Sequence, residues 1–138
     1  MNFTSQICTT KVQSEQLLTM GLKKETADME LHFFKDKVNK IYETACASKG
    51  YMEPEMAYLV DCFPAWSLHR LIEMMPSILH DLYEVDFSKR GVFYADFSNG
   101  SYNFIQAFAK PDKTLYDNII DCIEWLIKEG YFNKEYLE

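Results

Sequence analysis

A chain of 138 residues with 48% apolar and 25% charged residues has the size and composition of one soluble globular domain. Its formal net charge of -7 argues against a general binder of the nucleic-acid backbone, which needs clustered lysine and arginine. No apolar run has the length of a signal peptide core or a membrane span, so we expect a cytoplasmic protein that makes no membrane contact.

The first predicted element is a short helix near the N-terminus. Thr10 followed by Gln13 has the form of a capping box, in which each side chain bonds the other residue's backbone amide. Gly21 is expected to end this helix. The ending then places Leu22 where it can contact Leu17, the apolar contact of a Schellman motif.

The sequence DMELHFF, residues 28–34, alternates along its length and predicts a half-buried strand. The apolar residues of 38–46 have helical spacing, but isoleucine, tyrosine and threonine in the same window favour a strand. Both interpretations of 38–46 stay open. The sequence SKGYMEPE, residues 48–55, is expected to be a loop because it contains Gly50 and Pro54.

The sequence DCFPAWSLHRLIEMMP predicts how one helix starts and stops. Ser67 is a good N-cap residue, and an apolar stripe follows it. Trp66 and Leu71 then occupy the two positions of a hydrophobic staple. Pro64 stiffens the approach, and Pro76 ends the helix because it lacks an amide hydrogen.

From residue 82 the apolar pattern changes to a period of two. Three strands over roughly 82–88, 92–97 and 102–109 are predicted to form an antiparallel meander. The dipeptide Asn99 and Gly100 predicts a two-residue type I′ hairpin turn, which needs positive φ at both central positions.

The last predicted element is a helix over about 113–129, opened by Pro111 and Asp112 and capped by Gly130. Trp125 interrupts its polar side, so we expect either another part of the chain, such as the C-terminal tail, or an external partner to cover this ring. The polar face of the helix comprises Asp117, Asn118, Asp121, Glu124 and Lys128.

Together these elements predict an α+β fold in a single domain, residues 1–138. A three- to four-stranded antiparallel meander, with residues 28–34 as the fourth strand, is expected to pack against the long C-terminal helix and one or two shorter helices.

No motif with a strong catalytic signature occurs in the sequence, which lacks a P-loop, G-x-S-x-G and H-E-x-x-H. The cysteines, four in number, show no C-x-x-C spacing and are expected to be reduced thiols. Cys62 ahead of a helix, with His69 or His80 as its base, is the weak enzymatic alternative. His69 and Glu73 are too few for a zinc site, so no metal or cofactor is expected.

Aromatic residues of the meander would line both faces of its sheet, and only one face can meet helices. We therefore expect a non-enzymatic accessory protein that contacts a protein partner or itself through Trp125, Tyr94 and Tyr102. Direct nucleic-acid binding is not expected. The third alternative is an acidic DNA mimic that inhibits a DNA-binding enzyme, which rests on net charge alone.

Three stretches carry a resemblance: SEQLLTMGLKKETADM, PAWSLHRLIEMMP and YDNIIDCIEWLIKEGYFN. In this order they resemble small phage- and prophage-associated proteins of Bacteroides-type gut bacteria, a group without an assigned activity. The resemblance covers most of the chain except residues 35–60. It implies a mobile-element context and transfers no catalytic residue.

Overall fold

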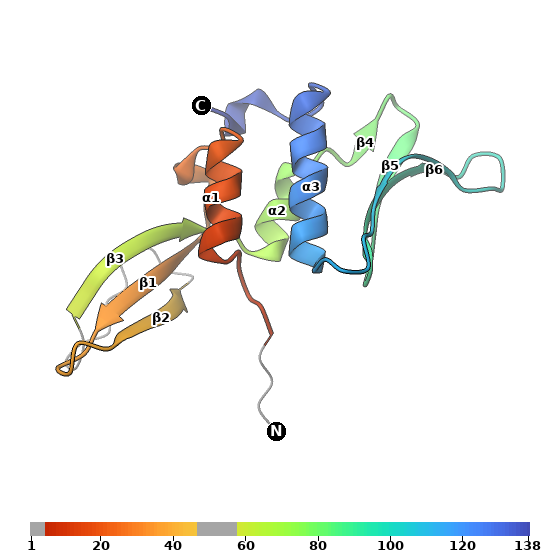
Figure 1. Cartoon of the computed structure of the whole chain (residues 1–138). Helices are drawn as coiled ribbons and strands as arrows, with labels where there is room; N and C mark the ends of the chain where they lie inside the picture. The colour runs from red at the N-terminus through yellow and green to blue at the C-terminus, as the bar shows by residue number, and fades with distance from the viewer. Residues whose placement is uncertain (1–4, 47–57) are drawn as a thin grey trace. The chain divides into compact units, whose positions relative to one another are not determined.

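The structure is a computed structural model that describes residues 5–46 and 58–138. The chain divides into two compact units, residues 1–70 and 71–138, which are described one at a time. In the described ranges it has three α-helices and two antiparallel sheets, of three and four strands, which confirms the α+β fold class (Figure 1). The expectation of one folding domain stays a prediction.

The first unit begins with helix α1, Lys11–Thr19, whose two ends are built as the sequence predicts. Both hydrogen bonds of the capping box between Thr10 and Gln13 are present. At the other end Gly21 has a φ of 99°. The Leu22 amide donates to the Leu17 carbonyl at 3.1 Å, which completes the Schellman ending.

A three-stranded sheet follows, with the order β2-β1-β3 and antiparallel pairing throughout. Strand β1 is Met29–Lys35, β2 is Ile41–Cys46 and β3 is Tyr58–Ala65, so the undecided segment 38–46 contains a strand (Figure 1). The expectation that residues 28–34 extend the meander is wrong, because β1 pairs inside this separate sheet. The expected loop 48–55 lies outside the described residues.

Strand β3 corrects a second expectation, that Cys62 lies in a loop ahead of the helix, because β3 includes both Cys62 and Pro64. Proline cannot donate to a strand ladder and is therefore tolerated mainly at sheet edges. Because β3 is an edge strand of its sheet, Pro64 fits there opposite Glu30.

Trp66 of the first unit is fully buried. Its backbone amide donates to Thr9 Oγ1 at 3.0 Å, and its carbonyl accepts from the Thr9 amide at 2.9 Å. Its indole Nε1 donates to Thr26 Oγ1 at 3.0 Å, and Thr26 belongs to the 3-10 helix η1, Lys24–Thr26. These bonds join three segments that are far apart in the sequence.

Helix α2, Leu68–Met74, starts where the sequence predicts. Ser67 Oγ accepts the Arg70 amide at 3.1 Å, the bond of an N-cap, and the helix ends before Pro76. The staple contact between Trp66 and Leu71 stays a prediction.

The second unit holds a four-stranded sheet with the order β4-β5-β6-β7. Strands β5 (Tyr83–Ser88), β6 (Gly91–Asp96) and β7 (Asn103–Phe108) confirm the meander. The fourth strand, β4, is the short Ile78–Leu79, which sequence patterns miss because two residues show no periodicity.

The tight turn with two positive φ angles lies between β4 and β5 and not at Asn99. His80 and Asp81 have φ of 53° and 55°, and the Leu82 amide donates to the Leu79 carbonyl at 3.1 Å, as in a type I′ turn. His and Asp are among the non-glycine residues that tolerate this region.

The link between β6 and β7 corrects the prediction of a two-residue hairpin. It spans residues 97–102, and of Asn99 and Gly100 only Gly100 has a positive φ, 71°. The Asp96 carboxylate accepts two hydrogen bonds from Ser98, one from its backbone amide at 2.7 Å and one from its hydroxyl at 3.0 Å. Side-chain bonds of this kind compete with the ladder and open the turn.

Helix α3 runs over Leu115–Lys128 and packs on β6 and β7. It begins two residues later than predicted, because Thr114 and Asp117 form a capping box. The 3-10 helix η2, Lys134–Tyr136, follows it.

Asn118 corrects the predicted polar face of α3, because it is fully buried. Its Oδ1 accepts the Lys110 amide at 3.1 Å, and its Nδ2 donates to the carbonyls of Arg90 and Lys110 at 3.1 and 3.3 Å. The helix thereby holds the β5–β6 turn and the end of β7. Near this point a Cβ on Gly91 would overlap the Phe108 backbone.

Candidate functional site

The three residues predicted to bind a partner have different environments. Trp125 is half-buried, and its ring lies 6.2 Å from Tyr94, 5.9 Å from Phe108 and 5.5 Å from Tyr131, measured between centroids. The sequence left open whether the chain itself or an external partner covers the Trp125 ring. In the structure the chain itself contacts the ring, and Tyr131 of the C-terminal tail is one of its neighbours.

Tyr94 is not on a surface, although its position in the meander suggested one. It is fully buried, and its hydroxyl donates to the Pro76 carbonyl at 2.7 Å. Burial, followed by the proximity of Cys122, raises the pKa of Tyr94. Tyr94 is thus a core residue, and alternation along β6 points the neighbouring Phe93 to the opposite face of the sheet.

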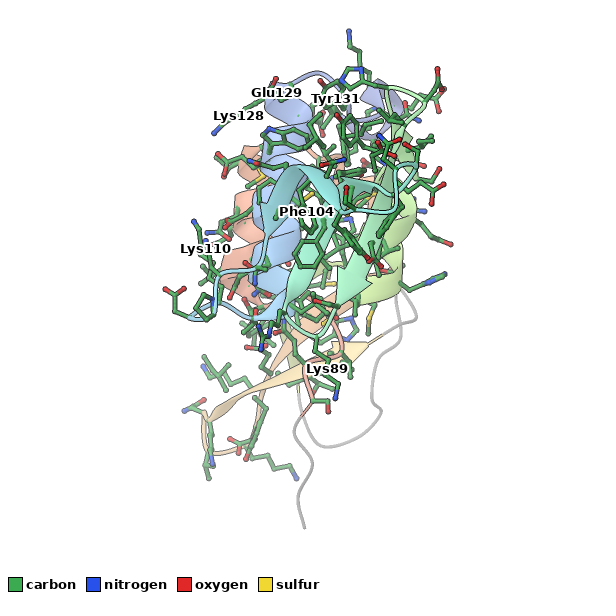
Figure 2. All side chains as sticks on the ribbon, turned by 90° about the vertical axis from the view of Figure 1, so that its right-hand side faces the viewer. Lys89, Phe104, Lys110, Lys128, Glu129 and Tyr131 are labelled. Carbon is green, nitrogen blue, oxygen red and sulfur yellow. The ribbon has the colours of Figure 1, made fainter. Side chains whose placement is uncertain are left out.

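Tyr102 belongs to a group of rings on that opposite face, which we call the open aromatic face: Phe93, Phe97, Tyr102 and Phe104. Phe97, Tyr102 and Phe104 are 42%, 50% and 52% exposed. The ring of Tyr102 stacks on that of Phe104, with 5.2 Å between their centroids. The ring of Phe97 lies edge-on to that of Tyr102, with 3.7 Å between centroids. Figure 2 shows the Phe104 ring standing out from the sheet, with α3 behind it.

Carboxylates of β5 lie beside these rings. Asp86 is the cross-strand partner of Phe93. Its carboxylate oxygen Oδ2 accepts a hydrogen bond from the Tyr102 hydroxyl at 3.0 Å. Desolvation, and then this bond to Asp86, raise the pKa of Tyr102. Glu84 is exposed two residues earlier on the same face of β5. The face therefore combines aromatic rings with negative charge.

The basic side chains near the meander gather elsewhere. A pocket of about 630 Å³ is lined by Lys89, Arg90, Lys110 and Lys113, with Ala109 and Pro111. Figure 2 shows Lys89 and Lys110 away from Phe104. Asp121 accepts from Lys113 at 2.6 Å and lies 3.8 Å from Lys110, which neutralises part of this charge.

A second candidate site lies in the three-stranded sheet of the first unit. Cys62 of β3 pairs directly with His32 of β1, and Glu30 is two residues from His32 on the same face. His32 Nε2 lies 3.0 Å from Glu30 Oε2. One carboxylate oxygen, one imidazole nitrogen and the Cys62 sulfur all lie within 4.8 Å of one another.

These three residues differ in their access to solvent. His32 is 2% exposed, Glu30 is half-buried and Cys62 is exposed. A pocket of about 260 Å³ reaches the cluster and is lined by Lys24, Glu25, Glu30, Cys62 and Pro64. The buried imidazole is therefore held by Glu30, while the thiol and the carboxylate face the open pocket.

This cluster changes the histidine expected beside Cys62. The imidazole that the structure places there is His32, whereas His69 is exposed on α2 and His80 bonds the Tyr131 hydroxyl at 2.8 Å in the other unit. Sequence spacing favoured the two nearer histidines. The pairing of β1 with β3, which brings residues thirty positions apart together, was not visible in it.

Cys8, Cys62 and Cys122 are free thiols. Burial, followed by the charges of Glu43 and Asp28, raises the pKa of Cys8 to about 11, and burial raises that of Cys122 to about 12. Both stay protonated at neutral pH, so Cys62 is the accessible thiol of these three.

Comparisons with known proteins return nothing: no family model, no curated protein and no solved structure matches the chain. The resemblance to phage-associated proteins stays a prediction. Among the described residues, no helix is both long and apolar enough to cross a membrane.

Proposed function

We propose that this protein is a non-enzymatic binding protein that contacts a partner protein through the open aromatic face. The observation that carries the proposal is the exposure of Phe97, Tyr102 and Phe104, which pack on one another at the surface. Contiguous exposed aromatic groups on a soluble protein mark interaction sites more often than chance. Tyrosine and phenylalanine are also enriched in protein interfaces.

The chemistry of the face favours a partner segment that carries arginine or lysine among apolar residues. Asp86 and Glu84 supply negative charge beside the rings, and the chain as a whole has a net charge of -7. A guanidinium can stack on an aromatic ring and bond a carboxylate at the same time. Complementary charge also steers the encounter of the two proteins.

The test starts by finding the partner at the face itself. A photo-reactive phenylalanine analogue in place of Phe104 would crosslink the bound protein in the cells that make this chain. The captured partner is then purified, and its Kd is measured for the wild type, Phe104→Thr and the control Val60→Thr. Val60 is a 55% exposed apolar residue of an edge strand in the other unit.

We expect Phe104→Thr to weaken binding at least tenfold, about 1.4 kcal/mol, and Val60→Thr to leave the Kd unchanged. Added salt should slow association, because charge steering is screened. Equal Kd values for both variants would refute the proposal. So would crosslinks to the same chain alone, with dimerisation lost in Phe104→Thr, since they would assign the face to self-association.

A further inference from the structure

We propose that Glu30, His32 and Cys62 form a zinc site with one coordination position open to the pocket beside Cys62. This site lies in the three-stranded sheet and is independent of the binding function proposed for the open aromatic face. Its ligand atoms are one carboxylate oxygen, one imidazole nitrogen and one sulfur, all within 4.8 Å of one another. Zinc takes these three donor types.

Strand geometry fixes the three side chains on one face. Glu30 and His32 are two positions apart on β1, so both point to the same side of the sheet. Cys62 is the direct cross-strand partner of His32 on β3. Two ligands from one strand and a third from its neighbour converge on one point without help from any loop.

The mutual distances favour a metal over a nucleophilic relay. In a relay the carboxylate lies behind the imidazole, so the full width of the ring separates it from the sulfur. Here one Glu30 carboxylate oxygen lies within 4.8 Å of both the Cys62 sulfur and an imidazole nitrogen of His32. Glu30 Oε2 lies 3.0 Å from His32 Nε2. A cation between the carboxylate and the sulfur would be attracted by both groups.

The surroundings suit a site with three protein ligands and an exchangeable fourth. Structural zinc sites are closed by four protein ligands, whereas open sites leave a position for water or another molecule. The pocket of about 260 Å³ at Cys62 and Glu30 supplies that opening, and Glu25 also lines it. When Zn²⁺ binds, the Cys62 thiol loses its proton to solvent and the imidazole binds in its neutral form.

The test uses the full chain with Zn²⁺ and with Co²⁺ as a spectroscopic substitute. Wild type, Cys62→Ser, Glu30→Gln and the control His69→Gln are compared by calorimetric titration. Cys62 and Glu30 are less buried than His32, so their variants are expected to fold, which circular dichroism checks. Peptide mapping then follows the alkylation of Cys62 with and without Zn²⁺.

We expect one Zn²⁺ per chain, and a thiolate-to-cobalt charge-transfer band that Cys62→Ser lacks. Loss of an outer-sphere partner alone weakens metal binding 10–100-fold, so Cys62→Ser and Glu30→Gln should each cost at least about tenfold. His69→Gln should bind as the wild type does, and Zn²⁺ should protect Cys62 from alkylation.

Two results would overturn the site. The first is a cobalt spectrum that is unchanged in Cys62→Ser, which would place the ion elsewhere. The second is alkylation of Cys62 at the same rate with and without Zn²⁺. In that case Zn²⁺ would not bind at the Cys62 thiol.

Discussion

Replacing Asn118 by alanine should destabilise the second unit by about 2–3 kcal/mol. The buried side chain makes three hydrogen bonds, and each is worth about 0.5–1.5 kcal/mol net. Alanine leaves the Lys110 amide and the Arg90 carbonyl without this partner. Loss of the bond to the Lys110 carbonyl contributes less to the destabilisation, because this carbonyl also accepts a hydrogen bond from the Lys113 amide at 3.2 Å.

The free energy of unfolding can be measured by urea titration followed by circular dichroism. Glu124→Ala on the same helix is the control, since it removes an exposed bond to Lys128 and should cost at most about 0.5 kcal/mol. Asn118→Asp should be more destabilised near neutral pH than in acid, because a carboxylate cannot donate to the two carbonyls. An Asn118→Ala protein as stable as the control would refute the reasoning.

Further predictions concern a close strand approach, a tight turn and the thiols. Gly91→Ala should lower the free energy of unfolding by about 2–3 kcal/mol in urea titration, because its Cβ would strike backbone atoms of the neighbouring strand, and an unchanged value would contradict the packing. Asp81→Val should lower the free energy of unfolding by about 1–2 kcal/mol, because a β-branched residue is strained at the positive φ of this position, whereas Asp81→Gly should change it little. Equal melting temperatures of these two variants would argue against the left-handed turn. Near neutral pH an alkylating reagent should modify Cys62 in the folded protein, but Cys8 and Cys122, with pKa values of about 11 and 12, only after unfolding. Peptide mass spectrometry would detect early labelling of either buried thiol, which would be inconsistent with their burial.

Local signals in the sequence predict most of the second unit and the helix ends. The capping box at Thr10, the N-cap at Ser67 and the three strands of the meander each depend on residues a few positions apart, and each is confirmed. Asn118 shows where such signals end. Its position on the helix predicts a solvent-exposed side chain. The side chain is instead buried and bonded to the backbone at Arg90 and Lys110, two segments that the sequence pattern could not place beside it.

The candidate sites depend on long-range pairing, which a single sequence does not display. Glu30 and His32 read as an ordinary strand, and Cys62 reads as a residue before a helix. Only the register of β1 with β3 brings the thiol opposite the imidazole. The aromatic content of the meander was visible in the sequence. Which rings are exposed depends on the face that α3 covers, so Tyr94 is buried and Tyr102 is not.

The placement of the two tryptophans gives the protein a pair of intrinsic reporters. Trp66 lies in residues 1–70 and is fully buried, and Trp125 lies in residues 71–138, among three other rings. Replacing either one by phenylalanine leaves a single tryptophan, whose emission monitors one half of the chain. If the two variants show the same unfolding midpoint by tryptophan emission, both halves unfold in one cooperative transition. If the midpoints differ, each half unfolds independently.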